Sequence, residues 1–150
     1  MNKMKRLKLC LLFTPFFILW MILSPTAFTG DFNKTHEKIS EDGKYKIVAY
    51  YVLPTTPVSF FQWAFEGDVF LVLYDADNNY LGQSSPFWFT DQYTIFGNDI
   101  LFPDDTDGED KSLYLNGVND FTEGYTIPVK KKKWWSVFYS FFNIIVKTHQ

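Results

Sequence analysis

The sequence is poor in the residues that most often perform chemistry or cross-link an exported protein. It has one cysteine, two histidines and one arginine among 150 residues. Cys10 lies in an N-terminal apolar run, so the rest of the chain forms no intramolecular disulfide and no thiolate metal site. His36 lies in a polar connector and His149 is the penultimate residue. Neither position suits the general base that activates a nucleophile.

The short motifs of common enzyme classes are also missing. The sequence contains no GxSxG, no HExxH, no phosphate-binding glycine loop and no dinucleotide-binding fingerprint. Acidic residues are too numerous for any one catalytic pair to stand out. We therefore expect a non-enzymatic protein with no cofactor and no metal site.

Residues 1–30 are expected to form a membrane anchor or signal segment. The basic stretch MNKMKRLK precedes a mainly apolar run, LCLLFTPFFILWMIL. Extended through SPTAF, this run would form a helix about 30 Å long, the thickness of a bilayer core. The lack of a small-x-small cleavage site favours an uncleaved anchor over a cleaved signal peptide. The basic N-terminus should stay in the cytoplasm, which predicts a single span in the bacterial inner membrane and a domain in the periplasm.

Charge is segregated along the chain. Residues 31–129 hold all seventeen acidic residues but only five lysines, which gives this segment a net charge of −12. The other basic residues lie in the two ends. An acidic body is a poor nucleic-acid binder, because phosphates require a basic face. It suits a basic protein partner, or its charge simply keeps an exported domain soluble.

Residues 31–129 are predicted to form an acidic antiparallel β domain. After the polar connector DFNKTHEKIS, the segment GKYKIVAYYVL alternates polar and apolar residues before it becomes wholly apolar, as a half-buried strand does. Residues 69–74 and 80–83 are expected to form a hairpin around a turn from Asp75 to Asn79. Shorter strands are expected at YTIF, DILF, SLYLN and YTIPV.

This pattern predicts a mainly β fold. We expect a small antiparallel sheet folded as a sandwich or partial barrel, with an N-terminal transmembrane helix and a C-terminal amphipathic helix. The Asp75 to Asn79 turn partly resembles a calcium loop, but Tyr80 stands where such a loop requires glycine, so a plain hairpin turn is expected.

Two stretches of the β domain resemble a known group of proteins. ISEDGKYKIVAYYV, followed by GDVFLVLYDADNNYLGQSSPF, is similar to small exported or membrane-anchored bacterial proteins with a Ser-x-Asp-Gly-Lys-Tyr strand opening and a Leu-Tyr-Asp hairpin. The motifs are structural: Asp42 and Gly43 make a turn, and Tyr74 and Asp75 enter one. Some of these proteins are suspected toxin-immunity proteins. The resemblance therefore implies a binding role and brings no catalytic residues.

Two groups of residues are candidates for contact with a partner. The segment PDDTDGED holds five carboxylates, which repel one another and should lie in an exposed loop. That loop is either solvated, a contact surface for a basic protein, or a cation site. In SPFWF the adjacent bulky residues cannot all point inward, which predicts an exposed apolar patch. The partner-binding candidates are Asp104, Asp105, Asp107, Glu109, Asp110, Phe87, Trp88 and Phe89.

A third aromatic group, FFQWAF from Phe60 to Phe65, has the spacing of a strand. Its side chains are expected to alternate between two faces, one of which belongs to the core, or to line a ligand groove.

Residues 130–150 are a basic and apolar tail. Thirteen mostly apolar residues, from Trp134 to Val146, would form a helix of about 20 Å, too short to cross a bilayer. Its polar side chains fall on one stripe of that helix. We expect an amphipathic helix that lies either in the membrane interface or on the sheet. The membrane-interface candidates are Lys130, Lys131, Lys132, Lys133, Trp134 and Trp135.

Two functions follow from these patterns. The first is a non-enzymatic, membrane-anchored periplasmic binding protein that recognises a basic protein partner, with a toxin-immunity protein as one form. The alternative is a structural or accessory envelope protein that associates with lipid or with another membrane protein.

Overall fold

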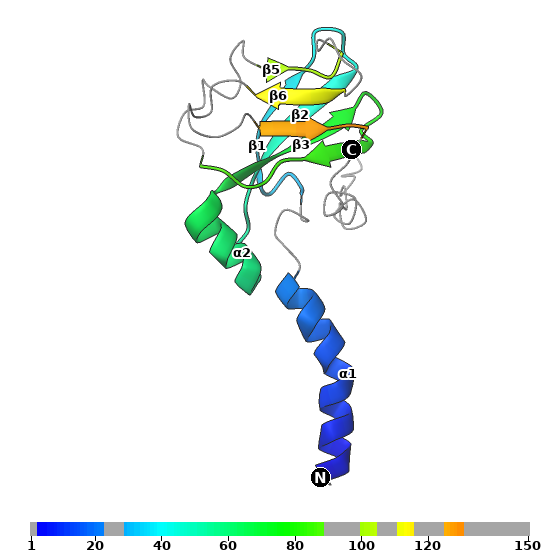
Figure 1. Ribbon diagram of the computed structural model, residues 1–150, viewed down its shortest axis with the longest axis vertical. Helices are drawn as coiled ribbons and strands as arrows, with labels where there is room; N and C mark the ends of the chain where they lie inside the picture. Colours follow the sequence, from blue (N-terminus) through cyan, green and yellow to red (C-terminus); the bar gives the residue numbers. More distant parts are fainter. Residues whose placement is uncertain (1–2, 23–28, 89–99, 105–110, 116–124, 131–150) are drawn as a thin grey trace.

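The protein is mainly β, with two antiparallel sheets and few helices (Figure 1). The computed structural model describes residues 3–22, 29–88, 100–104, 111–115 and 125–130. Within these residues the strands form two separate sheets and do not close into a barrel. The prediction of a mainly β, antiparallel fold is confirmed.

The larger sheet has four strands in the order β1-β2-β3-β4, and all neighbours are antiparallel. The strands are β1 (Lys34–Ile39), β2 (Tyr45–Tyr51), β3 (Val69–Asp75) and β4 (Tyr80–Gln83). β2 and β3 are rich in β-branched and aromatic residues, which favour strands.

The hairpin of β3 and β4 follows the prediction from the sequence. The Asp75 carboxylate accepts hydrogen bonds from the backbone N–H groups of Asp77, at 2.9 Å, and Asn79, at 2.8 Å. Asn78 adopts a positive φ of 62°, a conformation that asparagine tolerates better than most residues. The Asp and Asn residues between the strands therefore account for the turn.

The smaller sheet has three strands in the order β5-β6-β7, also antiparallel. They are β5 (Ile100–Leu101), β6 (Ser112–Leu115) and β7 (Tyr125–Pro128). Each lies within one of the predicted short strands, DILF, SLYLN and YTIPV. The predicted strand YTIF lies outside the described residues.

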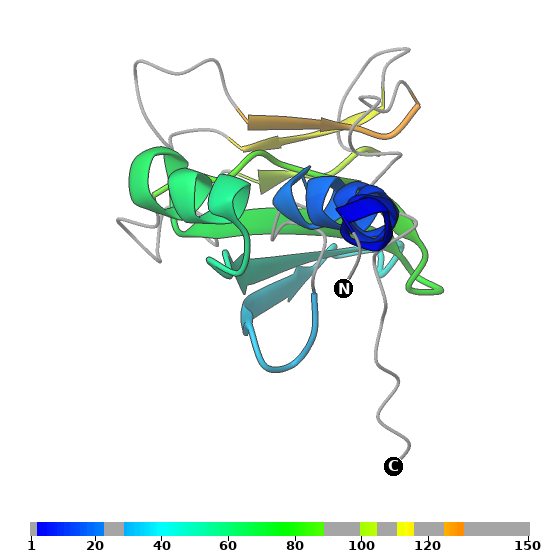
Figure 2. The same ribbon diagram turned by 90° about the horizontal axis from the view of Figure 1, so that it is seen from below.

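The two sheets face each other as separate layers, with an apolar core between them (Figure 2). Alternate residues of β2 and β3 point into this core, as the two-residue period of a strand requires. The core residues are Ile47, Ala49, Val69, Leu71, Leu73, Phe87, Ile100, Phe102, Leu113 and Ile127. The intervening residues form a second buried cluster on the opposite face of the larger sheet, made of Val48, Tyr50, Val52, Phe70, Val72 and Tyr74. Burial on both faces explains why β2 and β3 have almost continuous apolar sequences.

The N-terminal helix α1 (Lys3–Ile22) extends away from the β domain (Figure 1). Its apolar side chains from Leu11 to Met21 are exposed. Among the helices of the described residues, none meets the combined length and apolarity of a membrane-spanning segment.

A short helical segment joins β2 to β3. It consists of α2 (Pro57–Phe61) and a π-helical turn, η2 (Gln62–Glu66). The expectation of strand spacing from Phe60 to Phe65 is therefore wrong. The reason is a helix start signal: Thr56 caps the helix, Pro57 occupies its first turn, and the Thr56 and Ser59 side chains form a capping box.

Two further local expectations are corrected. The polar connector before residue 41 contains β1, an edge strand that pairs with β2 although it has no continuous apolar face. Phe87, expected in an exposed patch, is buried in the inter-sheet core. Its backbone bridges to Val69, with Phe87 N–H donating to Val69 C=O at 2.9 Å, which draws the ring inward.

Candidate functional site

The turn between β1 and β2 is built by the stretch SEDGKY. The backbone N–H of Ser40 donates to the carbonyl of Tyr45 at 2.9 Å, and that of Gly43 donates to the carbonyl of Ser40 at 3.0 Å. Gly43 has a φ of 71°, which glycine adopts at little cost. Asp42 Oδ1 accepts hydrogen bonds from the Ser40 hydroxyl, at 2.6 Å, and from the Lys44 N–H, at 3.0 Å. These contacts make Asp42 and Gly43 turn residues and fix where Lys44 leaves the backbone.

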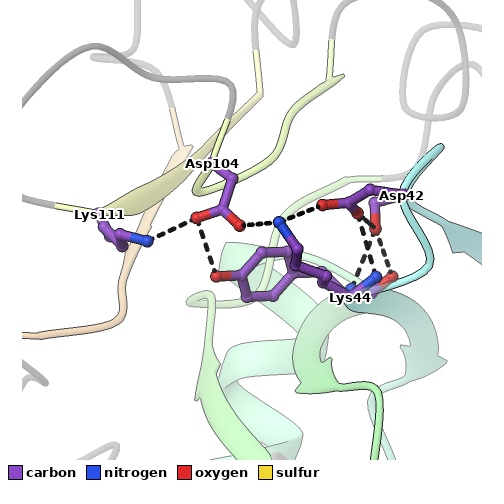
Figure 3. A network of polar contacts seen from close by, with 6 residues as sticks. Asp42, Lys44, Asp104 and Lys111 are labelled. Carbon is purple, nitrogen blue, oxygen red and sulfur yellow. Dashed lines mark hydrogen bonds and ion pairs between the residues drawn. The ribbon is translucent and has the colours of Figure 1, made fainter.

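An ion-pair network links this turn to the smaller sheet (Figure 3). Lys44 Nζ lies 3.0 Å from Asp42 Oδ2 and 3.0 Å from Asp104 Oδ2. Lys111 Nζ lies 2.6 Å from Asp104 Oδ1, to which the Tyr45 hydroxyl also donates at 3.3 Å. Asp104 follows β5 and Lys111 precedes β6 in the smaller sheet, whereas Lys44 precedes β2 in the larger one. The Asp104 carboxylate therefore connects the edges of the two sheets.

The network shifts the pKa of its members. The hydrogen bond from Ser40, followed by those from the backbone and side chain of Lys44, lowers the pKa of Asp42 from 3.8 to about 2. Hydrogen bonds from Lys111 and then Lys44 lower the pKa of Asp104. Hydrogen bonds to these carboxylates raise the pKa of both lysines. All four groups are therefore charged at neutral pH. Since the groups are solvated, their pairing fixes geometry more than it adds stability.

Beside the network, the edge between the sheets is hollowed into a depression of about 290 Å³. Its apolar lining includes Ile39, Ile100 and Phe102, and its carboxylates are Glu41, Asp42 and Asp104, with Lys38 as a basic neighbour. Within the described part of the chain, Glu41 forms no ion pair. We call this feature, defined by these seven residues, the acidic depression. Apolar surface beside carboxylates suits a lysine or arginine side chain, which buries its aliphatic stem and pairs its charged head.

The residues predicted from the acidic loop are only partly placed. Asp104 is the one that lies in the described residues, and it forms ion pairs inside the protein. The others lie outside the described residues, namely Asp105, Asp107, Glu109 and Asp110.

The predicted apolar and membrane-interface residues divide in the same way. Trp88 is exposed, Phe87 belongs to the core, and Phe89 lies outside the described residues. Lys130 is exposed at the end of the described chain. The rest of the predicted interface set lies outside it, namely Lys131, Lys132, Lys133, Trp134 and Trp135.

Comparison with known proteins places the chain in one family. A family model matches residues 5–139. The chain belongs to DUF6201, a family of unknown function. No curated protein and no solved structure matches the chain. The family therefore contributes no activity, ligand or partner, and the site is interpreted from its own geometry.

A second cavity, of about 320 Å³, lies on the outer face of the larger sheet. The hydroxyls of Tyr50 and Tyr74 lie 3.3 Å apart in its lining, and burial, with this hydrogen bond, raises the pKa of Tyr50. Lys46 lies over the Tyr74 ring, 5.4 Å from its centroid. The charged groups Lys34 and Glu37 neutralise each other in an ion pair of 2.6 Å. This cavity therefore gives a weaker basis for recognising a partner of one charge.

Several members of the site were missed by reasoning from the sequence, namely Glu41, Lys44 and Lys111. Lys44 and Asp104 are 60 residues apart, and no local pattern pairs them. The useful signal was the Ser-x-Asp-Gly turn, which places its flanking charges at the end of a hairpin. Among the described residues, no group of three His, Cys, Asp or Glu side chains is arranged to hold a metal ion.

Proposed function

We propose that this protein is a non-enzymatic binding protein, anchored in the bacterial inner membrane, whose β domain meets a basic protein partner in the periplasm. A toxin-immunity protein, which binds and neutralises a secreted toxin, is one form of this function. Recognition takes place at the acidic depression, and α1 provides the anchor.

The observation that carries the proposal is the composition of the acidic depression. Lys44 and Lys111 already pair Asp42 and Asp104, whereas Glu41 forms no ion pair among the described residues and lies beside the exposed side chain of Ile39. A lysine or arginine of the partner would pack its stem on this apolar surface and pair its charged head with Glu41. The net charge of −12 on residues 31–129 would accelerate the approach of a basic protein.

The surface of α1 supports the proposed anchoring in the membrane. Its basic residues precede an apolar stretch whose side chains, from Leu11 to Met21, are exposed. Each 100 Å² of apolar surface left in water costs about 2.5 kcal/mol, and insertion into a bilayer removes this cost. The basic residues favour the cytoplasmic side, which sends the β domain into the periplasm.

The test is site-specific photo-crosslinking in cells that produce the full chain. A photoreactive amino acid replaces Glu41 in the depression or, as a matched control, Asp77, an exposed carboxylate in the β3–β4 turn that does not line the depression. We expect position 41 to capture one basic protein and position 77 to capture none. Glu41→Lys should abolish co-purification of that protein, and Asp77→Lys should leave it unchanged. No specific capture at position 41, or equal effects of the two charge reversals, contradicts the proposal.

The second candidate function is a structural or accessory envelope protein that associates with lipid or with another membrane protein. It is favoured by the exposed aromatic side chains of α2 and η2, which water solvates poorly. The basic and aromatic tail, Lys130 to Trp135, would add to such an association in the same way. In the crosslinking experiment this function predicts capture at the aromatic segment and none at Glu41.

A further inference from the structure

The segment formed by α2 and η2 has an exposed aromatic surface. Phe60 is 55%, Phe61 54%, Trp63 42% and Phe65 69% exposed. The only charged residue between Pro57 and Glu66 is Glu66 itself, at the C-terminal end. In a domain of net charge −12, this segment therefore presents an aromatic surface with a single charge at its end.

This surface is held in a defined conformation. Thr56 Oγ1 accepts a hydrogen bond from the Ser59 N–H at 3.1 Å, and Ser59 Oγ accepts one from the Thr56 N–H at 2.7 Å. Ser59 is buried, so the segment rests on the domain through this side while its rings point outward. The rings also contact each other: the Phe60 and Trp63 centroids are 5.9 Å apart, and those of Phe61 and Phe65 are 4.9 Å apart.

The segment lies at the end of the molecule from which α1 extends. α2 contacts α1, and Figures 1 and 2 both show α2 beside the C-terminal end of α1. The exposed apolar surface of α1 includes Trp20, close to this end. Two exposed apolar surfaces from distant parts of the sequence therefore meet at one end of the protein.

We propose that α2 and η2 form a foot that lies in the membrane interface, at the boundary between headgroups and acyl chains where α1 leaves the bilayer. This inference rests on the proposed anchoring of α1. Tryptophan and other aromatic rings favour this layer, and an apolar helix face enters it by about 5–10 Å. The near absence of charge lets the segment approach anionic headgroups that repel the rest of the acidic domain.

The sheet topology determines how far the acidic depression lies from the foot. The foot connects the end of β2 to the start of β3, whereas the β1–β2 turn and its Asp42 lie at the opposite end of β2. Seven-residue strands separate these ends by about 23 Å. A foot in the interface therefore holds the depression away from the bilayer, where a soluble partner reaches it.

The experiment measures membrane depth with a single fluorescent label on the full chain. Cys10 is the only cysteine, so Cys10→Ser combined with Phe17→Cys carries a single label in the middle of the apolar run of α1. Cys10→Ser combined with Phe61→Cys labels the foot, and Cys10→Ser combined with Asp77→Cys labels the β3–β4 turn as a control at the far end of the domain. Each protein is reconstituted in phosphatidylethanolamine and phosphatidylglycerol vesicles that carry nitroxide lipids, with the spin label either shallow or deep.

We expect three different quenching patterns. Phe17 lies near the middle of the apolar run that begins at Leu9 and extends through SPTAF, so deep nitroxide should quench a label at position 17 best. The label at position 61 should be quenched best by shallow nitroxide. Its emission should lie at a shorter wavelength than that of the label at position 77, which remains in water. The label at position 77 should be quenched by neither. A Cys10→Ser, Phe65→Cys protein repeats the measurement at a second exposed ring.

The outcomes separate this inference from the proposed function. Labels at positions 61 and 65 that escape quenching while the label at position 17 is quenched by deep nitroxide overturn the foot and leave the anchor intact. A label at position 17 that escapes quenching overturns the anchor, whatever the result at position 61. Near-UV circular dichroism of each protein must match the wild type, since an unfolded domain would expose every label.

Discussion

The packing of the two sheets predicts a large difference between two leucine-to-alanine substitutions in the smaller sheet. Leu113, on β6, is fully buried in the inter-sheet core, whereas Leu101, on β5, is 39% exposed. Removing a buried leucine side chain costs the lost transfer free energy and leaves a cavity, about 2–5 kcal/mol in total. Leu101→Ala should change the free energy of unfolding by about 0.5 kcal/mol. Both residues are leucines in paired strands, so the chemical change is matched and burial is the variable.

The assay is urea unfolding of the full chain in detergent micelles, followed by near-UV circular dichroism. With a denaturant dependence of about 1–3 kcal/mol per molar urea, Leu113→Ala should lower the midpoint by roughly 1 M or more. Leu101→Ala should move it only slightly. Equal midpoints for the two variants would refute the conclusion that the three-stranded sheet packs on the four-stranded one.

Three further predictions concern the turn, the helix cap and the link to β3. The folded-state pKa of Asp42 lies below its ordinary value, so its charge stabilises the fold above pH 3.8 and this contribution is lost as the pH falls towards 2. Asp42→Asn should therefore flatten the pH dependence of the urea midpoint between these pH values. A pH dependence parallel to that of the wild type would count against the network. Ser59→Ala removes half of the capping box and should cost about 1 kcal/mol of unfolding free energy, whereas Thr55→Ala, outside the box, should have little effect in the same measurement. Gly67→Ala places a Cβ 2.0 Å from the Phe87 carbonyl carbon and should lower the free energy of unfolding by about 1–3 kcal/mol. Gly43→Ala, also at positive φ but with no atom within 4 Å of the new Cβ, should lower it by less. A larger loss for Gly43→Ala than for Gly67→Ala would contradict the packing of Phe87 beside β3.

The sequence was most informative where local chemistry decides the structure. The β3–β4 hairpin was predicted because two apolar runs flank Asp75 and Asn79, whose side chains favour a turn. β1 was missed because an edge strand needs hydrogen bonds to its neighbour and no apolar face, so KTHEKI carries no strand pattern. The α2 helix was missed because four aromatic residues outweighed the Thr-Pro start signal, although that signal determines the backbone there.

The candidate site lay largely beyond the reach of local patterns. The five-carboxylate loop includes Asp104, but the pattern did not predict its ion pairs, because Lys44 precedes β2 of the larger sheet and Lys111 precedes β6 of the smaller one. Which sheet edges meet depends on the packing of the whole core. Phe87 shows the same limit: three adjacent bulky residues cannot all be buried, yet only the bridge to Val69 determines which of them turns inward.

The central claim is that the chain is anchored in the inner membrane with its β domain in the periplasm. It is tested most directly by cysteine labelling of intact spheroplasts with a membrane-impermeant maleimide, on full-length Cys10→Ser, Asp77→Cys protein and on the wild type. We predict that both proteins remain in the membrane pellet after carbonate extraction, that the thiol introduced at position 77 reacts in intact spheroplasts, and that Cys10 of the wild type is protected. Release of the protein by carbonate, or labelling of position 77 only after lysis, would contradict the claim.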